Sequence, residues 1–268
     1  MMKKTNRIKL FIAAAALIGT TASAQLIDEK DVSITLDLQP VLQLDMTTPD
    51  QIEFVFDEIN EYQAGITQYA ATILKVSSTV SWDLYAVGRS QGNTGAGFWD
   101  QQVDYGNDNV NAVANLPLSL LEIRQSQQNS STATDPTKLD YSANFQNANT
   151  IGALVDPGTF VGTNNIYVDP AGLGTPPPAT ERYIAGHKGT SGVGDFMPGG
   201  TYLNQTGPRS DYYYTMDYRI LPGLPAIFPM AYDIVGGAQN IVTENTPSSY
   251  AEPGVYTMYV QYILLEDQ

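Results

Sequence analysis

The sequence predicts an all-β protein, an immunoglobulin-like antiparallel β-sandwich with long loops or an insertion in its middle. Short runs of alternating apolar and polar residues recur along the chain, and turns rich in Gly, Pro and Asn separate them. The composition, with 17 Tyr, 23 Gly and 16 Pro, is typical of such extracellular β proteins. Beyond the first 24 residues, no window of about 11 to 18 residues has a sustained apolar stripe of helical period. We therefore expect little helix.

The first 24 residues are predicted to be a cleaved export signal of bacterial type. Four basic residues open the chain: Lys3, Lys4, Arg7 and Lys9. The apolar run LFIAAAALIG follows, and Ala22-Ser23-Ala24 offers a cleavage site before Gln25. No later stretch approaches the roughly 18 apolar residues of a transmembrane helix. We expect residues 25–268 to form a single domain in the periplasm, at the cell surface or outside the cell.

Charge and cysteine content exclude several classes of partner and site. The chain carries 13 basic and 28 acidic residues, for a net charge of −15. Nucleic acid is excluded as a partner because phosphate binding needs a basic surface. The absence of cysteine removes disulfides, thiolate zinc sites and lipid attachment at an N-terminal cysteine. The 244 residues left after removal of the first 24 of 268 are enough to bury a core without disulfides.

The first strand signal lies at residues 32–38, directly after the predicted cleavage site. Its apolar residues alternate with polar ones: Val32, Ile34, Leu36 and Leu38. Pro40 interrupts the pattern because proline cannot donate to a central ladder, and residues 42–46 resume it. We expect two short strands or one bent strand that passes between sheets. Because it alternates so regularly, residues 32–38 are also the segment we expect to pair with an open sheet edge of a neighbouring subunit.

The next strand signals cover residues 52–56, 69–78 and 80–88. We expect the last two to pair as a hairpin, with Trp82 in the core of the sandwich. The alternative for Trp82, a platform that stacks against a sugar, would require its side chain to be exposed.

From residue 89 to residue 209 the chain is rich in Gly, Asn, Gln, Ser and Thr. One convincing strand, residues 116–124, lies within this region, together with shorter candidates at 158–168, 179–186 and 200–206. A structureless stretch of this length is improbable in a compact domain, so we expect an insertion with short strands or a set of long loops. An acidic loop in this region leaves a structural calcium site open as an alternative to a solvated loop: Asp100, Asp104, Asn107, Asp108 and Asn109.

Regular strand signals return at residues 211–221, 226–235 and 254–265. In the first of these, one face is expected to join the core or, alternatively, to form a self-assembly surface: Tyr212, Tyr214, Met216 and Tyr218. The last strand divides into an apolar and a mixed face. We assign its apolar face to the core of the chain's own sandwich: Tyr256, Met258, Val260, Tyr262 and Leu264.

No motif in the sequence predicts catalysis, a cofactor or a metal centre. His187 is the single histidine, and Ser191 and Asp195 near it lack the G-x-S-x-G context of a nucleophile. Asp57, Glu58 and Glu61 illustrate how freely a carboxylate pair could be drawn from 28 acids, whereas a glycosidase requires a defined separation across a cleft. We therefore expect a non-enzymatic protein.

Two segments carry a resemblance to known families. EYQAGITQYAATILKVSSTVSWDLYAVG and PGVYTMYVQYILL resemble secreted bacterial β-sandwich surface proteins of the WxL-like, spore-coat-U-like and fimbrial-subunit type. The match covers about residues 31–88 and 228–265, and the lack of cysteine departs from many fimbrial subunits. The resemblance implies a structural or adhesive surface protein, with a pilus-like filament subunit as one form. A carbohydrate-binding module presenting Trp82 or Trp99, and an outer-membrane β-barrel, are the alternatives.

Overall fold

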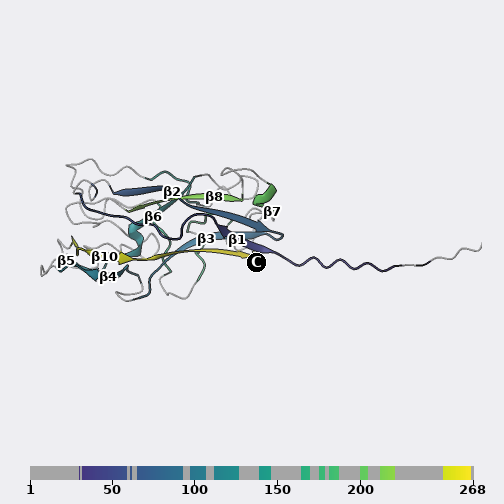
Figure 1. The fold of residues 1–268 in the computed structure, drawn as a ribbon, viewed down its shortest axis with the longest axis horizontal. Helices are drawn as coiled ribbons and strands as arrows, with labels where there is room; N and C mark the ends of the chain where they lie inside the picture. The colour runs from purple at the N-terminus through teal and green to yellow at the C-terminus, as the bar shows by residue number, and fades with distance from the viewer. Residues whose placement is uncertain are drawn as a thin grey trace, which may run out of the picture. The chain divides into compact units, whose positions relative to one another are not determined.

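A computed structural model describes residues 30, 32–58, 61, 65–92, 97–106, 112–126, 139–145, 164–169, 175–178, 181–186, 200–204, 212–220 and 250–266. The chain divides into two compact units, residues 1–39 and residues 40–268. The second unit is all-β (Figure 1). Its strands are β1 (Leu42–Met46), β2 (Ile66–Ser78), β3 (Trp82–Arg89), β4 (Asp100–Asp104), β5 (Ala112–Val113), β6 (Leu121–Gln125), β7 (Gly200–Thr201), β8 (Tyr213–Ile220), β9 (Tyr250–Ala251), β10 (Gly254–Thr257) and β11 (Tyr259–Glu266). No helix in the described residues is long and apolar enough to span a membrane.

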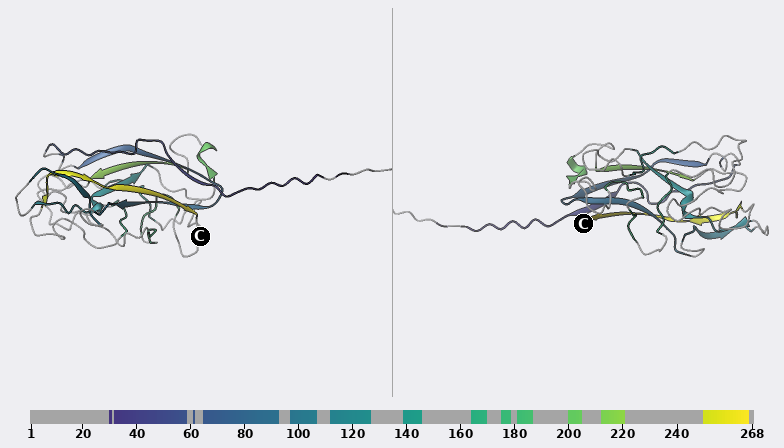
Figure 2. Two further views of the ribbon diagram at one scale, coloured as in Figure 1. Left: turned by 60° about the horizontal axis from the view of Figure 1, so that its bottom comes forward. Right: turned by 180° about the vertical axis from the view of Figure 1, so that it is seen from behind.

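The largest sheet has the order β1-β2-β8-β6, with β7 also paired to β2, and all its pairings are antiparallel. β3 pairs antiparallel with β11, and β4 pairs antiparallel with β10. A short parallel pair joins β5 and β9. Figure 2 shows β8, in green, beside β2, and the yellow C-terminal strand in a separate layer with β3.

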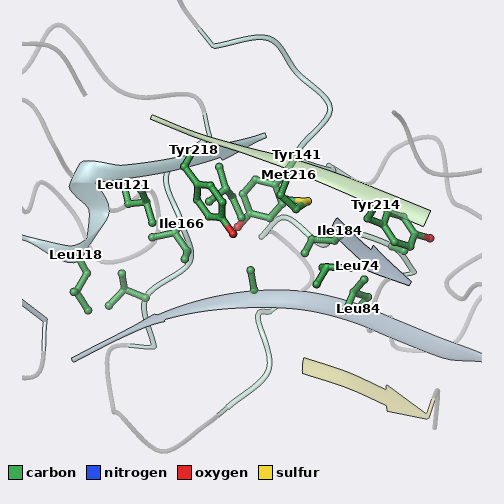
Figure 3. Close-up of a cluster of buried hydrophobic side chains, with 14 of the residues drawn as sticks. Leu74, Leu84, Leu118, Leu121, Tyr141, Ile166, Ile184, Tyr214, Met216 and Tyr218 are labelled. Atoms are coloured by element: carbon green, nitrogen blue, oxygen red, sulfur yellow. The ribbon is translucent and has the colours of Figure 1, made fainter. Parts of the chain in front are cut away.

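The core lies between the large sheet and the β3–β11 pair. The large sheet contributes Leu74 and Val76 of β2 with Tyr214, Met216 and Tyr218 of β8, all buried. From the other layer come the buried side chains of β3: Trp82, Leu84 and Ala86. Figure 3 shows the β8 side chains gathered with Leu84, Ile166 and Ile184 in one cluster. Two sheets that bury their inner faces against each other form a β-sandwich, which confirms the predicted fold class.

The predicted hairpin between residues 69–78 and 80–88 is wrong. β2 belongs to the large sheet, whereas β3 pairs with β11 in the opposite layer, so the short link between them crosses the core. Ser78 shapes this link, because its hydroxyl donates to the carbonyl of Val80 and accepts from the Val80 N–H. The burial of Trp82, which is 0% exposed, confirms its assignment to the core.

The predicted strand at residues 32–38 is also wrong for the isolated chain. Residues 32–39 form no ladder with any described residue, and regular pairing begins at Leu42. Residues 52–56 likewise lack strand structure, although Phe54 and Phe56 pack against the core. Alternation alone does not provide a hydrogen-bonding partner, and a strand needs one.

The C-terminal region follows the prediction closely. Residues 211–221 contain β8, and residues 254–265 form β10 and β11, which pair with β4 and β3 of the same chain. The predicted apolar face of the last strand packs against the core: Tyr256, Met258, Val260, Tyr262 and Leu264. Residues 226–235 lie outside the described part of the chain.

Described parts of the loop-rich region 89–209 are built into the core. The predicted strand 116–124 begins as a 3-10 turn, Leu118–Leu120, and continues as β6. Short bridges then join this region to the sandwich: Leu84 to Ala185, Gly88 to Val168 and Glu122 to Asn165. Ile166, Val168, Ile184 and Ala185 are buried in the main cluster.

Candidate functional site

Two strands of the sandwich have one edge each that no described strand covers. β1 pairs with β2 on one side, and β11 pairs with β3 on one side. No strand among the described residues lies on the second side of either. Such an edge presents main-chain donors and acceptors to any extended chain that approaches it.

The hydrogen bonds of β1 show which of its residues face this open edge. The Thr79 N–H donates to the Val41 carbonyl at 2.9 Å, and the Thr47 N–H donates to the Ile73 carbonyl at 3.1 Å. Odd-numbered residues of this ladder therefore direct their main chain toward β2. Because successive residues alternate in an antiparallel strand, the main-chain groups of Leu42, Leu44 and Met46 point to the open edge.

The same reasoning applies to β11. The N–H groups of Leu84 and Gly88 donate away from it, to Ala185 and Tyr167, each at 2.8 Å. The alternate residues of β3 therefore face β11, and the register places the odd-numbered residues of β11 opposite them. The open edge of β11 is formed by the remaining main-chain groups: Val260, Tyr262 and Leu264.

A groove of about 360 Å³ lies between these two edges. It is lined by Leu42 and Leu44 of β1 and by Gln261, Tyr262, Ile263 and Leu264 of β11. Leu44, Tyr262 and Leu264 are half-buried and pack against the core. On β1, Leu42 is 37% exposed and Met46 is 45% exposed, although both share the parity of Leu44. The sandwich is therefore incompletely covered along this side.

The deep end of Tyr262 is part of a chain of hydroxyl groups. Tyr218 donates to the Thr72 hydroxyl at 2.7 Å, and the Tyr218 and Tyr262 hydroxyls are hydrogen-bonded to each other. Burial raises the pKa of Tyr218 above 10 and the pKa of Tyr262 well above 10. Both phenols are therefore neutral at physiological pH, and this wall of the groove suits apolar groups better than a charged ligand.

Residues 32–38, in the other compact unit, present the complementary feature. Their four apolar side chains are largely exposed, at 83% for Val32, 88% for Ile34, 78% for Leu36 and 79% for Leu38. Ser33, Thr35 and Asp37 alternate with them. The segment is thus an extended chain with one apolar face, one polar face and no ladder to any described residue.

The carboxylates considered for glycoside cleavage have a local role. The Glu61 carboxylate accepts the Asp57 N–H at 2.9 Å and the Glu58 N–H at 3.0 Å. These hydrogen bonds lower the pKa of Glu61 by stabilising its charged form. The arrangement fixes a turn and places no carboxylate pair across a cleft.

The acidic loop considered for calcium is described only in part. The Asp100 carboxylate is buried and accepts the Gln91 N–H at 2.5 Å, and Asp104 accepts the Gly106 N–H at 2.6 Å. Asn107, Asp108 and Asn109 lie outside the described residues, as do His187, Ser191 and Asp195. Within the described part of the chain, no group of three or more His, Cys, Asp or Glu side chains is placed to hold a metal ion.

The aromatic candidates belong mainly to the core. Trp82 packs against Tyr212 and Tyr214 with ring centroids 6.3 Å away in each case. Trp99 is half-buried against the same cluster, so neither tryptophan presents the flat exposed face that sugar stacking needs. On β8, Tyr214, Met216 and Tyr218 are buried, which confirms the core interpretation of that face over a self-assembly surface.

Sequence reasoning missed the buried charges on β8. Arg219 forms an ion pair with Glu122, and Asp217 binds Arg124 at 3.2 Å. Asp217 also accepts the N–H of Ala70, which has φ 51 and sits in a bulge of β2. Arg219 and Asp217 are the only charged residues of β8, so their position inside a strand was the available signal. The pairs satisfy one another and offer no free reactive group.

Comparison with known proteins adds no relative to this assignment. No protein-family model matches the chain, and no curated protein matches it. The function must therefore be inferred from the open edges, the apolar groove and the exposed segment.

Proposed function

We propose that this protein is an exported, non-enzymatic structural or adhesive protein of the bacterial cell surface. It acts through protein–protein or protein–polymer contacts, and it assembles with itself as a filament subunit does. The exposed, alternating segment of residues 32–38 carries this proposal. Its four apolar side chains, all on one face, are 78–88% exposed.

The energetics favour a partner for this segment. Burying a Val, Leu or Ile side chain contributes about 1.5–3 kcal/mol, so four such residues offer a substantial driving force. Contiguous exposed apolar surface of this kind marks interaction sites in soluble proteins. The extended backbone adds its unpaired N–H and C=O groups, which a sheet edge can satisfy.

The net charge of −15 supports a restricted set of partners. A strongly acidic protein is repelled by nucleic acid and by anionic lipid, so its apolar segment is directed toward proteins or neutral polymers. The same charge keeps the protein soluble before it assembles.

The test compares the chain from Gln25 onward with a variant that lacks residues 25–38. Multi-angle light scattering over a concentration series should show oligomers for the first protein and a monomer for the second. Ile34→Asp should reproduce the loss by placing a charge on the apolar face, while Thr35→Asp, on the polar face, should assemble normally. Unchanged assembly of the deletion variant would refute the role of this segment.

A further inference from the structure

We propose that the groove between β1 and β11 receives residues 32–38 of a second copy of this chain, which add as a strand to the open edge of β1. This inference rests on the proposed self-association and names its acceptor. Each copy then offers a segment at one place and a groove at another, which makes the contact heterologous. Contacts of that type produce rings or open filaments.

The lengths of the segment and the edge agree. β1 comprises Leu42–Met46, and the hydrogen bonds of Val41 and Thr47 to the β2 side extend its ladder by one residue at each end. The extended ladder, residues 41–47, therefore spans as many residues as the segment 32–38. A strand of this length can pair along the whole edge without an overhanging apolar residue.

The faces also agree. Leu42, Leu44 and Met46 turn their side chains to the core side of β1, and the first two line the groove. A strand paired with β1 continues its pleat, so one of its faces must lie over the groove and the other must face away. In residues 32–38 one face is entirely apolar and the other carries Ser33, Thr35 and Asp37. The apolar face would cover Leu42 and Met46, which are 37% and 45% exposed.

The connection to β1 favours a second copy over insertion into the chain's own groove. Val41 already exchanges hydrogen bonds with Thr79, through its carbonyl and through its N–H, so the chain follows the direction of β1 from this residue onward. A reversal would have to be made by Gln39 and Pro40. The tight hairpin turns require positive φ at the first loop residue, which Gln39 resists, and Pro40 is excluded from type I′ by its fixed negative φ.

Cysteine cross-linking can test this directly because the natural chain has no cysteine. One protein carries a single cysteine in the segment, from the set Val32→Cys, Ile34→Cys, Leu36→Cys and Leu38→Cys. A second protein carries Leu44→Cys or the more exposed Leu42→Cys. Directly opposed residues on adjacent strands lie roughly 4.5–5.5 Å apart at Cα, within the range that a disulfide spans. Mild oxidation of a mixture should yield a disulfide-linked heterodimer.

The matched control is Thr35→Cys, which lies on the polar face of the same segment. Mixed with Leu44→Cys, it should cross-link far less than the best of the apolar-face variants. A segment that lies loosely across the groove would give equal yields on both faces, and this result would overturn the proposal. A cross-linked monomer from a chain that carries both cysteines, with no heterodimer from the mixture, would show insertion into its own groove and would also overturn it.

Two further outcomes separate this inference from the proposed function. Assembly that depends on residues 32–38 but gives no cross-link to Leu42→Cys or Leu44→Cys would leave the function standing and would place the acceptor elsewhere. Absence of both assembly and cross-link would overturn the two together. As a measurement that needs no cysteine, Leu42→Asp should weaken association about tenfold or more, because a charge on the groove lining opposes apolar docking. Gln43→Asp, on the opposite face of β1, should have much less effect.

Discussion

The first and last strand-like segments of the chain, residues 32–38 and residues 254–266, have opposite surroundings in the structure. The second is paired with β4 and β3 over its length and packs one face on the core. The first has no ladder to any described residue and exposes all four of its apolar side chains. Both alternate apolar and polar residues, so alternation decides which face is apolar and leaves the partner undecided.

The difference lies in what neighbours each segment. β11 runs beside β3, whose two faces are both buried and whose second edge is bridged by residues 168 and 185. Residues 32–38 precede β1, whose free edge belongs to a groove with exposed Leu42 and Met46. One strand completes the sandwich of its own chain, whereas the other has the composition of a strand that completes a different copy.

Deleting each segment should give the largest contrast. Removing residues 259–266 takes away the only described strand partner of β3 and uncovers Leu84 and Ala86. The lost burial exceeds the 5–15 kcal/mol that typically stabilises a domain, so we expect no cooperative unfolding transition. The variant without residues 25–38 should unfold at the same denaturant concentration as the chain from Gln25 onward. Denaturant titration followed by tryptophan fluorescence measures both, and a destabilised N-terminal deletion would contradict the contrast.

A matched pair of leucine substitutions sharpens the comparison. Leu264→Ala should lower the free energy of unfolding by about 2 kcal/mol, because this half-buried side chain packs against the core. Leu36→Ala should change it by less than about 0.5 kcal/mol, because Leu36 is 78% exposed. Only Leu36→Ala should weaken self-association. Equal destabilisation by the two substitutions would mean that residues 32–38 are packed on their own chain.

Local pattern was sufficient to predict the strands and their faces. β1, β8 and the β10–β11 segment appear at the expected residues, and Trp82 is in the core. The immunoglobulin-like topology remains a prediction. Pairing was less accessible: β2 and β3 are separated by Thr79–Ser81 and alternate as a hairpin would, yet they lie in different layers. Which strands pair depends on contacts far apart in sequence, and a short link does not encode them.

The two halves of the candidate site differ in the same way. Residues 32–38 could be proposed as a pairing segment from alternation alone, because the pattern is local. The groove could not, because it is formed by β1 and β11, which are adjacent only after the sandwich has folded. The isolated segment also shows why the predicted strand is absent: its pattern specifies a strand that its own chain does not pair.

Alkaline pH should destabilise the sandwich through Tyr218 and Tyr262. Burial raises the pKa of both above their ordinary value of 10, so the folded state retains protons that the unfolded state releases. Stability is therefore fully present below pH 10 and falls as the pH rises above it, by at most about 1.4 kcal/mol per tyrosine at one unit above. Tyr262→Phe should lessen this fall. The variant without residues 25–38 should keep the full fall, because that segment contains no tyrosine.

The smallest expected effect is the response of self-association to salt. Docking of residues 32–38 on β1 would bring Asp37 to the same solvent side as Asp45, in a protein of net charge −15. Salt screens this repulsion, since the Debye length is about 10 Å at 0.1 M and about 3 Å at 1 M. Sedimentation velocity should therefore show association that tightens by roughly two- to fivefold over this range. Asp37→Asn should tighten association at low salt and reduce its dependence on salt. Association that weakens as salt rises would indicate ion pairs at the contact, and an apolar strand in the groove could not explain it.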